Sequence, residues 1–179
     1  INHEGLDYYD RVIDTLLEAD IEPWITLFHW DFPTALYDRG GWLNKDSSDW
    51  FVEFAGIICD RYSDRVSRWF TLNEPQCFLG LGHHSGAHAP GMRMSFEKVL
   101  QASHHVLLAH GKAVQTMRAK AKQPLTIGAA PVGLVTYPTT DDPVQIEAAR
   151  QATFAIKDIG CFSNTWYADP MIKGQYPED

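Results

Sequence analysis

The segment WFTLNEP at residues 69–75 ends an apolar run with an amide, Asn73, and a carboxylate, Glu74. A charged group at the end of a buried strand is costly unless it is paired, hydrated or used in chemistry. One interpretation is that Glu74 is a structural carboxylate that caps the following turn. The other is a catalytic carboxyl group, and the surroundings of Glu74 have to decide between the two.

A second polar cluster, His29–Trp30–Asp31, directly follows the apolar run 24–28. Reactive side chains collect at the carboxyl ends of parallel strands, so we expect this cluster and the amide–carboxylate pair to share one rim. Together they would offer hydrogen-bond donors, one aromatic face and one carboxyl group. That combination suits a polyhydroxylated ring, because hydroxyl groups need neutral partners and glycoside cleavage needs a carboxylic acid.

Helical and strand-like segments alternate along the chain. Apolar residues recur at helical spacings of three and four, and short continuous apolar runs indicate strands buried on both faces. The predicted helices cover residues 5–20, 49–62, roughly 95–120, and 141–160 with Pro143 in the first turn. The predicted strands lie within residues 24–28, 65–75 and 124–135, whereas residues 80–91 and 161–179 are predicted to be loops. Helix caps are predicted at Asp46, Ser47 or Ser48, at Ser95, and at Asp141 or Asp142.

Helices that alternate with buried strands predict a parallel sheet with right-handed crossovers. Three parallel strands leave two edges unpaired and cannot close a barrel of eight. A small α/β domain with three strands is one possibility. We favour a segment of a larger (β/α)8 barrel, because of the motifs described below.

The composition limits the classes of protein to which the chain can belong. Of its 179 residues, 45% are hydrophobic, which suits one ordinary core. A net charge of -8, from 15 basic and 23 acidic residues, argues against nucleic acid or an anionic membrane as a partner. No apolar run approaches the roughly 20 residues that span a bilayer.

The three cysteines, Cys59, Cys77 and Cys161, form an odd set at wide spacings. This favours reduced thiols and a cytoplasmic location over a disulfide framework. Cys77 follows Glu74 closely, yet no basic residue adjoins it, so a packed thiol is favoured over a nucleophile. The sequence shows no signal peptide, but it begins with Ile1, so we expect an upstream part outside it.

Other side chains near the clusters allow competing interpretations. Asp31 could act with Glu74 as an inverting pair of carboxylates, but a structural salt bridge or turn bond is favoured. His83, His84 and His88 have an HHxxxH spacing that invites a metal site. No evident carboxylate or cysteine set accompanies them, so we expect a solvated loop near the pocket mouth and no metal. The histidines on the long helix are expected to pack or to support the site: His104, His105 and His110.

Several motifs, taken together, resemble glycoside hydrolase family 1, the β-glucosidase family. They follow the family's order: NHEGLDYYDRVIDTLLEADIEPWITL, FHWDFP, GGW, TLNEP, GAHAPG, HHVLLAHGKAV, EAARQA and NTWYADPMIKGQYP. TLNEP alone would be a moderate indication, whereas the combination covers nearly the whole chain. The resemblance implies a (β/α)8 TIM barrel. Residues 1–179 would be one partial glycosidase domain, roughly strands 3 to 5 with their helices, and no separate second domain is expected.

The same resemblance implies roles for four residues. Glu74 would be the general acid/base, and Asn73 would bond the sugar 2-hydroxyl. His29 and Trp30 would contact hydroxyl groups of the ring next to the scissile bond. The family's nucleophile is a second glutamate in a TENG-type motif, and the sequence holds no such motif. The implied function is therefore a retaining β-glycosidase that hydrolyses terminal β-linked glucosides without a cofactor.

Two alternatives stay open. One is a 6-phospho-β-glycosidase, whose phosphate-binding residues would lie outside the sequence. The other is a noncatalytic carbohydrate-binding relative, which loss of the acid/base glutamate would favour, although Glu74 is present. The expected partners are a β-glucoside or short β-linked oligosaccharide and the remaining segments of the same barrel. Residues 1–179 alone are expected to be inactive, because one of the two catalytic carboxyl groups is missing.

Overall fold

The computed structural model describes residues 1–156 and 160–178. Its centre is a parallel sheet in the order β1–β2–β3, formed by Trp24–Phe28, Arg68–Asn73 and Thr126–Ala130. In the register, Phe28 pairs with Leu72, and Asn73 pairs with Ala130. The predicted strands and their parallel arrangement are confirmed.

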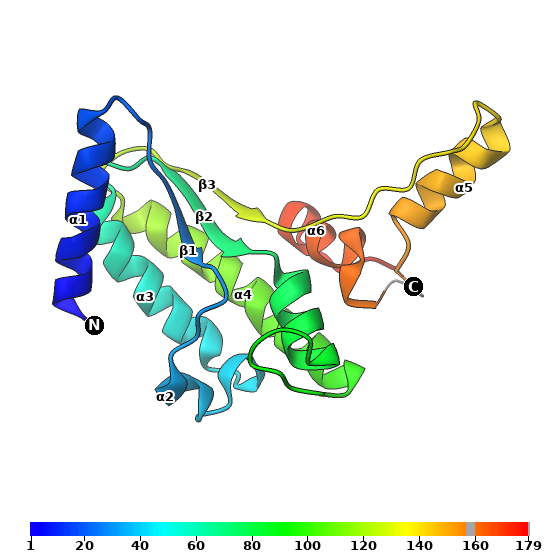
Figure 1. The fold of residues 1–179 in the computed structure, drawn as a ribbon, viewed down its shortest axis with the longest axis horizontal. Helices are drawn as coiled ribbons and strands as arrows, with labels where there is room; N and C mark the ends of the chain where they lie inside the picture. Colours follow the sequence, from blue (N-terminus) through cyan, green and yellow to red (C-terminus); the bar gives the residue numbers. More distant parts are fainter. Residues whose placement is uncertain (157–159, 179) are drawn as a thin grey trace.

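Helices flank this sheet (Figure 1). Those predicted over 5–20, 49–62 and 95–120 lie close to these ranges, whereas the one predicted over 141–160 ends at Thr153. The α-helices are α1 (His3–Glu18), α2 (Thr34–Tyr37), α3 (Ser47–Tyr62), α4 (Phe96–Lys120), α5 (Pro143–Thr153) and α6 (Asn164–Lys173). The shorter or irregular helices are η1 (Gly41–Leu43), the π-type helix η2 (Gln76–Ser85) and η3 (Gly160–Phe162). Helices α3 and α4 pack against each other beside the sheet, whereas α5 stands apart at the end of an extended segment (Figure 1). Within residues 1–156 and 160–178, no helix is long and apolar enough to cross a membrane.

Side-chain caps fix some helix starts. Asp142 accepts a hydrogen bond from the backbone N–H of Val144 at 3.1 Å, and Pro143 occupies the first turn, where its missing N–H is not needed. Asp46 and Ser95 also stand at cap positions, but neither side chain makes a capping hydrogen bond.

Two predicted loops are wrong. Residues 80–85 belong to η2, and the tail contains α6. Tertiary contacts override a composition rich in Gly and His at η2, where Phe78 packs into the aromatic core. In α6, the hydroxyl of Tyr167 lies 3.0 Å from that of Ser103 on α4, and both residues are buried.

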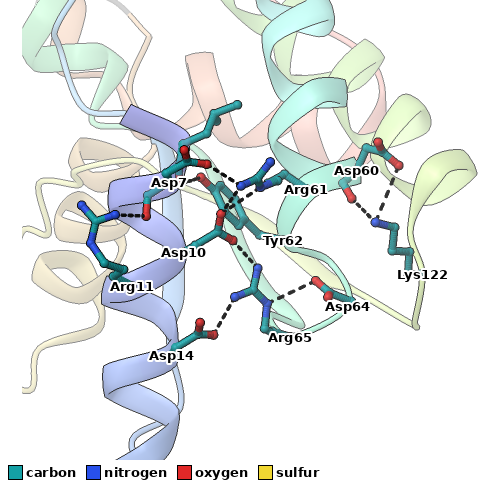
Figure 2. Close-up of polar contacts among 11 residues, drawn as sticks. Asp7, Asp10, Arg11, Asp14, Asp60, Arg61, Tyr62, Asp64, Arg65 and Lys122 are labelled. Atoms are coloured by element: carbon teal, nitrogen blue, oxygen red, sulfur yellow. Dashed lines mark hydrogen bonds and ion pairs between the residues drawn. The ribbon is translucent and has the colours of Figure 1, made fainter. Parts of the chain in front are cut away.

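The core lies between the sheet and the helix pair α3–α4. Its largest fully buried side chain is Trp69 of β2, whose indole N–H donates to the Val66 carbonyl at 3.0 Å. A polar network fixes α1 to the end of α3 (Figure 2). In this network two guanidinium groups, those of Arg61 and Arg65, meet the carboxylates of three residues of α1: Asp7, Asp10 and Asp14.

Candidate functional site

The carboxyl ends of β1 and β2 bring the two polar clusters together. The side-chain amide nitrogen of Asn73 lies 3.4 Å from Nε2 of His29. The indole N–H of Trp30 donates to the backbone carbonyl of Asn73 at 3.0 Å. The expectation that both clusters share one rim is therefore confirmed, and Glu74 follows on the same rim. The Trp30 indole N–H, however, is engaged with backbone and is not a free donor.

The backbone at this rim is unusual. Trp30 has a φ of 81° and Glu74 a φ of 46°, both in the left-handed region that side chains with a Cβ rarely adopt. Such conformations cost on the order of 1–3 kcal/mol each and persist only where the surroundings impose them. The N–H of Glu74 donates to the Ala130 carbonyl at 2.8 Å, and its own carbonyl accepts from Cys77 at 2.9 Å. Strand β3 and helix η2 thus hold Glu74 from both sides.

Cys77 lies in the first turn of η2, the helix that directly follows the Glu74–Pro75 pair. Burial raises the pKa of its thiol to about 11, and the neighbouring Glu74 carboxyl group acts in the same direction. A thiol with such a pKa stays protonated near neutral pH and is a poor nucleophile. This agrees with the predicted packed thiol.

The histidines of the glycine-rich segment point to different partners. Nδ1 of His83 lies 2.6 Å from the Phe78 carbonyl, and Nδ1 of His84 lies 2.9 Å from the Met94 carbonyl. The His88 ring packs 5.5 Å from the Trp30 ring, which sequence reasoning did not foresee, because nothing in the spacing links residue 88 to strand β1. In the described part of the chain, no group of three or more His, Cys, Asp or Glu side chains could hold a metal ion.

Of the histidines on α4, His110 supports the rim, whereas His105 packs against η1 and His104 is exposed, with its Nδ1 2.7 Å from the Tyr176 hydroxyl. Nδ1 of His110 lies 2.7 Å from the hydroxyl of Thr71, two residues before Asn73 on β2. Burial lowers the pKa of His110, so its ring is neutral. His105 is buried and its Nδ1–H donates to the Trp42 carbonyl at 2.8 Å.

Asp31 differs from its predicted structural role. It is exposed, and within residues 1–156 and 160–178 its side chain forms neither an ion pair nor a hydrogen bond in a turn. It lines a cavity with Trp30 rather than pairing with a cation.

Comparison with known proteins decides which fold these strands belong to. The model of glycosyl hydrolase family 1 matches residues 1–179. The chain belongs to this family. It is 42% identical over 179 residues to beta-glucosidase A of Acetivibrio thermocellus and 37% identical to beta-glucosidase A of Thermotoga maritima. The matches cover 100% and 99% of this chain but 38% of each relative, so the chain spans about 38% of their length.

Solved structures of family 1 enzymes also resemble this chain. The beta-glucosidase from Thermotoga maritima in complex with glucoimidazole superposes with a TM-score of 0.85 at 37% identity, covering 99% of this chain and 39% of that one. The same enzyme in complex with deoxynojirimycin gives a TM-score of 0.84. These neighbours are TIM barrels, so β1, β2 and β3 with their helices are a part of such a barrel. The predicted fold class is confirmed.

Proposed function

We propose that the whole protein is a retaining β-glycosidase of the β-glucosidase type, with Glu74 as its acid/base. The observation that carries this proposal is the rim itself: His29 and Asn73 lie within 3.4 Å of each other, next to Glu74, in a family 1 chain. The left-handed backbone of Glu74, held by β3 and η2, also supports this role, because strained backbone conformations cluster at active sites.

Each residue then has a distinct task. Glu74 donates a proton to the leaving oxygen in the first step and takes one from water in the second. Asn73 and His29 donate or accept hydrogen bonds to hydroxyl groups of the sugar. Trp30 presents its aromatic face to the C–H side of the ring, because its N–H already binds the Asn73 carbonyl.

The second carboxylate would come from another segment of the barrel. In a retaining site the two carboxyl groups stand about 5–5.5 Å apart, and the second attacks the anomeric carbon. Residues 1–179 by themselves are therefore predicted not to turn over β-glucosides. The partial domain, its docking to the remaining barrel segments and the cytoplasmic location stay predictions.

The stereochemistry of hydrolysis tests this function. The full-length enzyme is expected to hydrolyse an aryl β-glucoside and to release the β-anomer first, as a proton NMR spectrum recorded within minutes would show. The curated relatives are named beta-glucosidases, so the unphosphorylated glucoside is the first substrate to try. Turnover of the 6-phosphoglucoside alone would favour a 6-phospho-β-glycosidase, and binding without turnover of either would favour a carbohydrate-binding protein.

A further inference from the structure

A cavity of about 280 Å³ lies next to the rim. It opens between the end of β1, helix α2, η1, η2 and the segment at Ala89–Pro90. Its walls are largely aromatic: Phe28, Trp30, Phe32, Tyr37, Trp42 and Phe78. Trp30 is the one wall that it shares with the proposed sugar site.

The aromatic walls are packed against one another and keep the cavity open. The Phe28 ring meets the Trp42 ring at 5.3 Å and 87°, and it meets the Phe78 ring at 4.9 Å and 72°. The Phe32 ring meets the Trp42 ring at 5.3 Å and 66°. Edge-to-face contacts of this kind are favourable and fix the ring planes, so the cavity is preformed.

The far wall, Ala89–Pro90, is also fixed. Three backbone hydrogen bonds tie its flanks to η2: His88 to Leu81 at 3.0 Å, Met92 to Gly82 at 2.9 Å and Met94 to His83 at 2.8 Å. Gly82 permits this close approach, because a Cβ there would lie 2.5 Å from the Ala89 carbonyl oxygen.

Buried His83 supplies a hydrogen-bond acceptor to this cavity. Its Nδ1 lies 2.6 Å from the Phe78 carbonyl, which can only accept, so the proton is on Nδ1. Burial lowers the pKa of His83, so the ring is neutral and Nε2 carries a lone pair. No group in residues 1–156 or 160–178 makes a hydrogen bond to Nε2. His83 is only 6% exposed, yet it lines the cavity.

Trp42 contributes its ring and no donor. Its side chain is 3% exposed, and its indole nitrogen is buried from solvent, so a ligand in the cavity does not reach the N–H. Two other polar groups on the walls are engaged, since Trp30 donates to Asn73 and the Tyr37 hydroxyl to the Met92 sulfur. One acceptor among aromatic rings, Nε2 of His83, matches a ligand that carries one hydroxyl group on a flat ring.

The negative charge of Asp31 at the mouth of the cavity limits the charge that a ligand can carry. Asp31 and Thr34 are exposed residues of the cavity wall. Asp31 is the one carboxylate among the residues that line the cavity. A carboxylate at the entrance disfavours anions such as benzoate and permits neutral rings.

We propose that this cavity is a second binding site that takes a neutral phenol-type ring, whose hydroxyl group donates to Nε2 of His83. The site is separate from the proposed acid/base chemistry, so it can be tested by binding alone.

The test compares phenol with its methyl ether, anisole, on the full-length protein by isothermal titration calorimetry. Phenol is expected to bind with a Kd on the order of 1–10 mM, a typical affinity for so small a ligand. Anisole keeps the ring but cannot donate a hydrogen bond, so it should bind roughly 5-fold more weakly. Equal affinity of the two ligands, or no phenol binding up to about 50 mM, would overturn the proposal.

Two variants locate the ligand, and a third serves as control. His83→Phe keeps a ring but removes the acceptor, so phenol should bind no better than anisole. Thr34→Phe, at an exposed mouth position, should abolish binding of both. His84→Phe, at the neighbouring exposed histidine outside the lining, should leave both affinities unchanged. If His83→Phe fails to fold, Thr34→Phe still decides, and unchanged phenol affinity in Thr34→Phe would refute the assignment.

Discussion

The indole N–H of Trp30 donates to the backbone carbonyl of Asn73 at 3.0 Å and so joins the end of β1 to the end of β2. The bond crosses 43 residues of sequence and holds a tryptophan whose φ is 81°. It places the aromatic ring beside the amide and next to the Glu74 backbone. The geometry of the proposed sugar site therefore depends on this contact.

Removing that hydrogen bond should loosen the rim. Trp30→Phe keeps an aromatic ring but leaves the Asn73 carbonyl without this donor, so the free energy of unfolding should fall by about 1 kcal/mol or more. In the full-length enzyme, kcat/KM for a β-glucoside should fall at least about 10-fold. Trp50→Phe, an aromatic replacement on α3 away from the rim, is the control. Unchanged kcat/KM in Trp30→Phe would mean that the contact does not position the site.

Gly82 should tolerate no side chain. In Gly82→Ala the new Cβ would lie 2.5 Å from the Ala89 carbonyl oxygen, and backbone would have to move. We expect a loss of about 1–3 kcal/mol in the free energy of unfolding by urea denaturation.

Gly111→Ala is the matched control for this substitution. Gly111 lies inside α4, and no side chain or other segment comes within 4 Å of the point that a Cβ would occupy. Alanine there should be neutral or should stabilise the protein by up to about 1 kcal/mol. If both variants had the same stability, the close approach at Gly82 would not be real.

The network between α1 and α3 should make stability depend on pH (Figure 2). Hydrogen bonds from Arg61 and then Arg65 hold the pKa of Asp10 below its usual value. A carboxyl group whose pKa is lowered by folding stabilises the protein above the pKa of the unfolded state, about 3.9, and this contribution is lost as pH falls through the folded-state pKa.

Asp10→Asn should therefore cost about 1 kcal/mol at pH 7 and progressively less below about pH 4. Urea denaturation at several pH values measures the difference between the two proteins. Glu53→Gln, an exposed substitution on helix α3, should show no such trend. A difference that stayed constant down to about pH 2 would contradict the assigned role of Asp10.

Asn164 should hold in place the segment around Leu134 that leads to α5. Its side-chain amide donates to the carbonyls of Leu134 and Thr153, each at 2.7 Å, and its oxygen accepts from the Leu134 N–H at 3.0 Å. Asn164→Ala removes all three bonds, so hydrogen exchange of the Leu134 amide should accelerate at least about 10-fold. Thr165→Ala, at the next residue, keeps these bonds and should change the Leu134 rate much less. Equal rates in the two variants would show that the amide does not fasten the segment.

The helices and strands that the sequence predicted are those specified by residues close to one another in the chain. Apolar periodicity was enough for α1, α3 and α4, and buried runs were enough for the three strands. The rule that parallel strands share a rim was enough to place Asn73 near His29. In each case one short stretch, or one general packing rule, carries the result.

What the sequence did not predict depends on contacts between distant residues. Helix η2 forms in a segment rich in Gly and His because Phe78 packs with Phe28 and Trp42. Helix α6 forms because Tyr167 is buried against Ser103. The positive φ of Trp30 and its bond to Asn73 likewise require both strands in place. No local pattern encodes these contacts.

The assignment of Glu74 as the acid/base is tested most directly by its dependence on the leaving group. Glu74→Gln in the full-length enzyme should lower kcat/KM by about 10²–10⁴-fold for a β-glucoside with a poor leaving group, such as an alkyl alcohol. It should lower kcat/KM far less for dinitrophenyl β-glucoside, whose departure needs little protonation. Glu97→Gln, at an exposed glutamate in α4, should lower neither. Equal losses for both substrates, or no loss for either, would contradict the account.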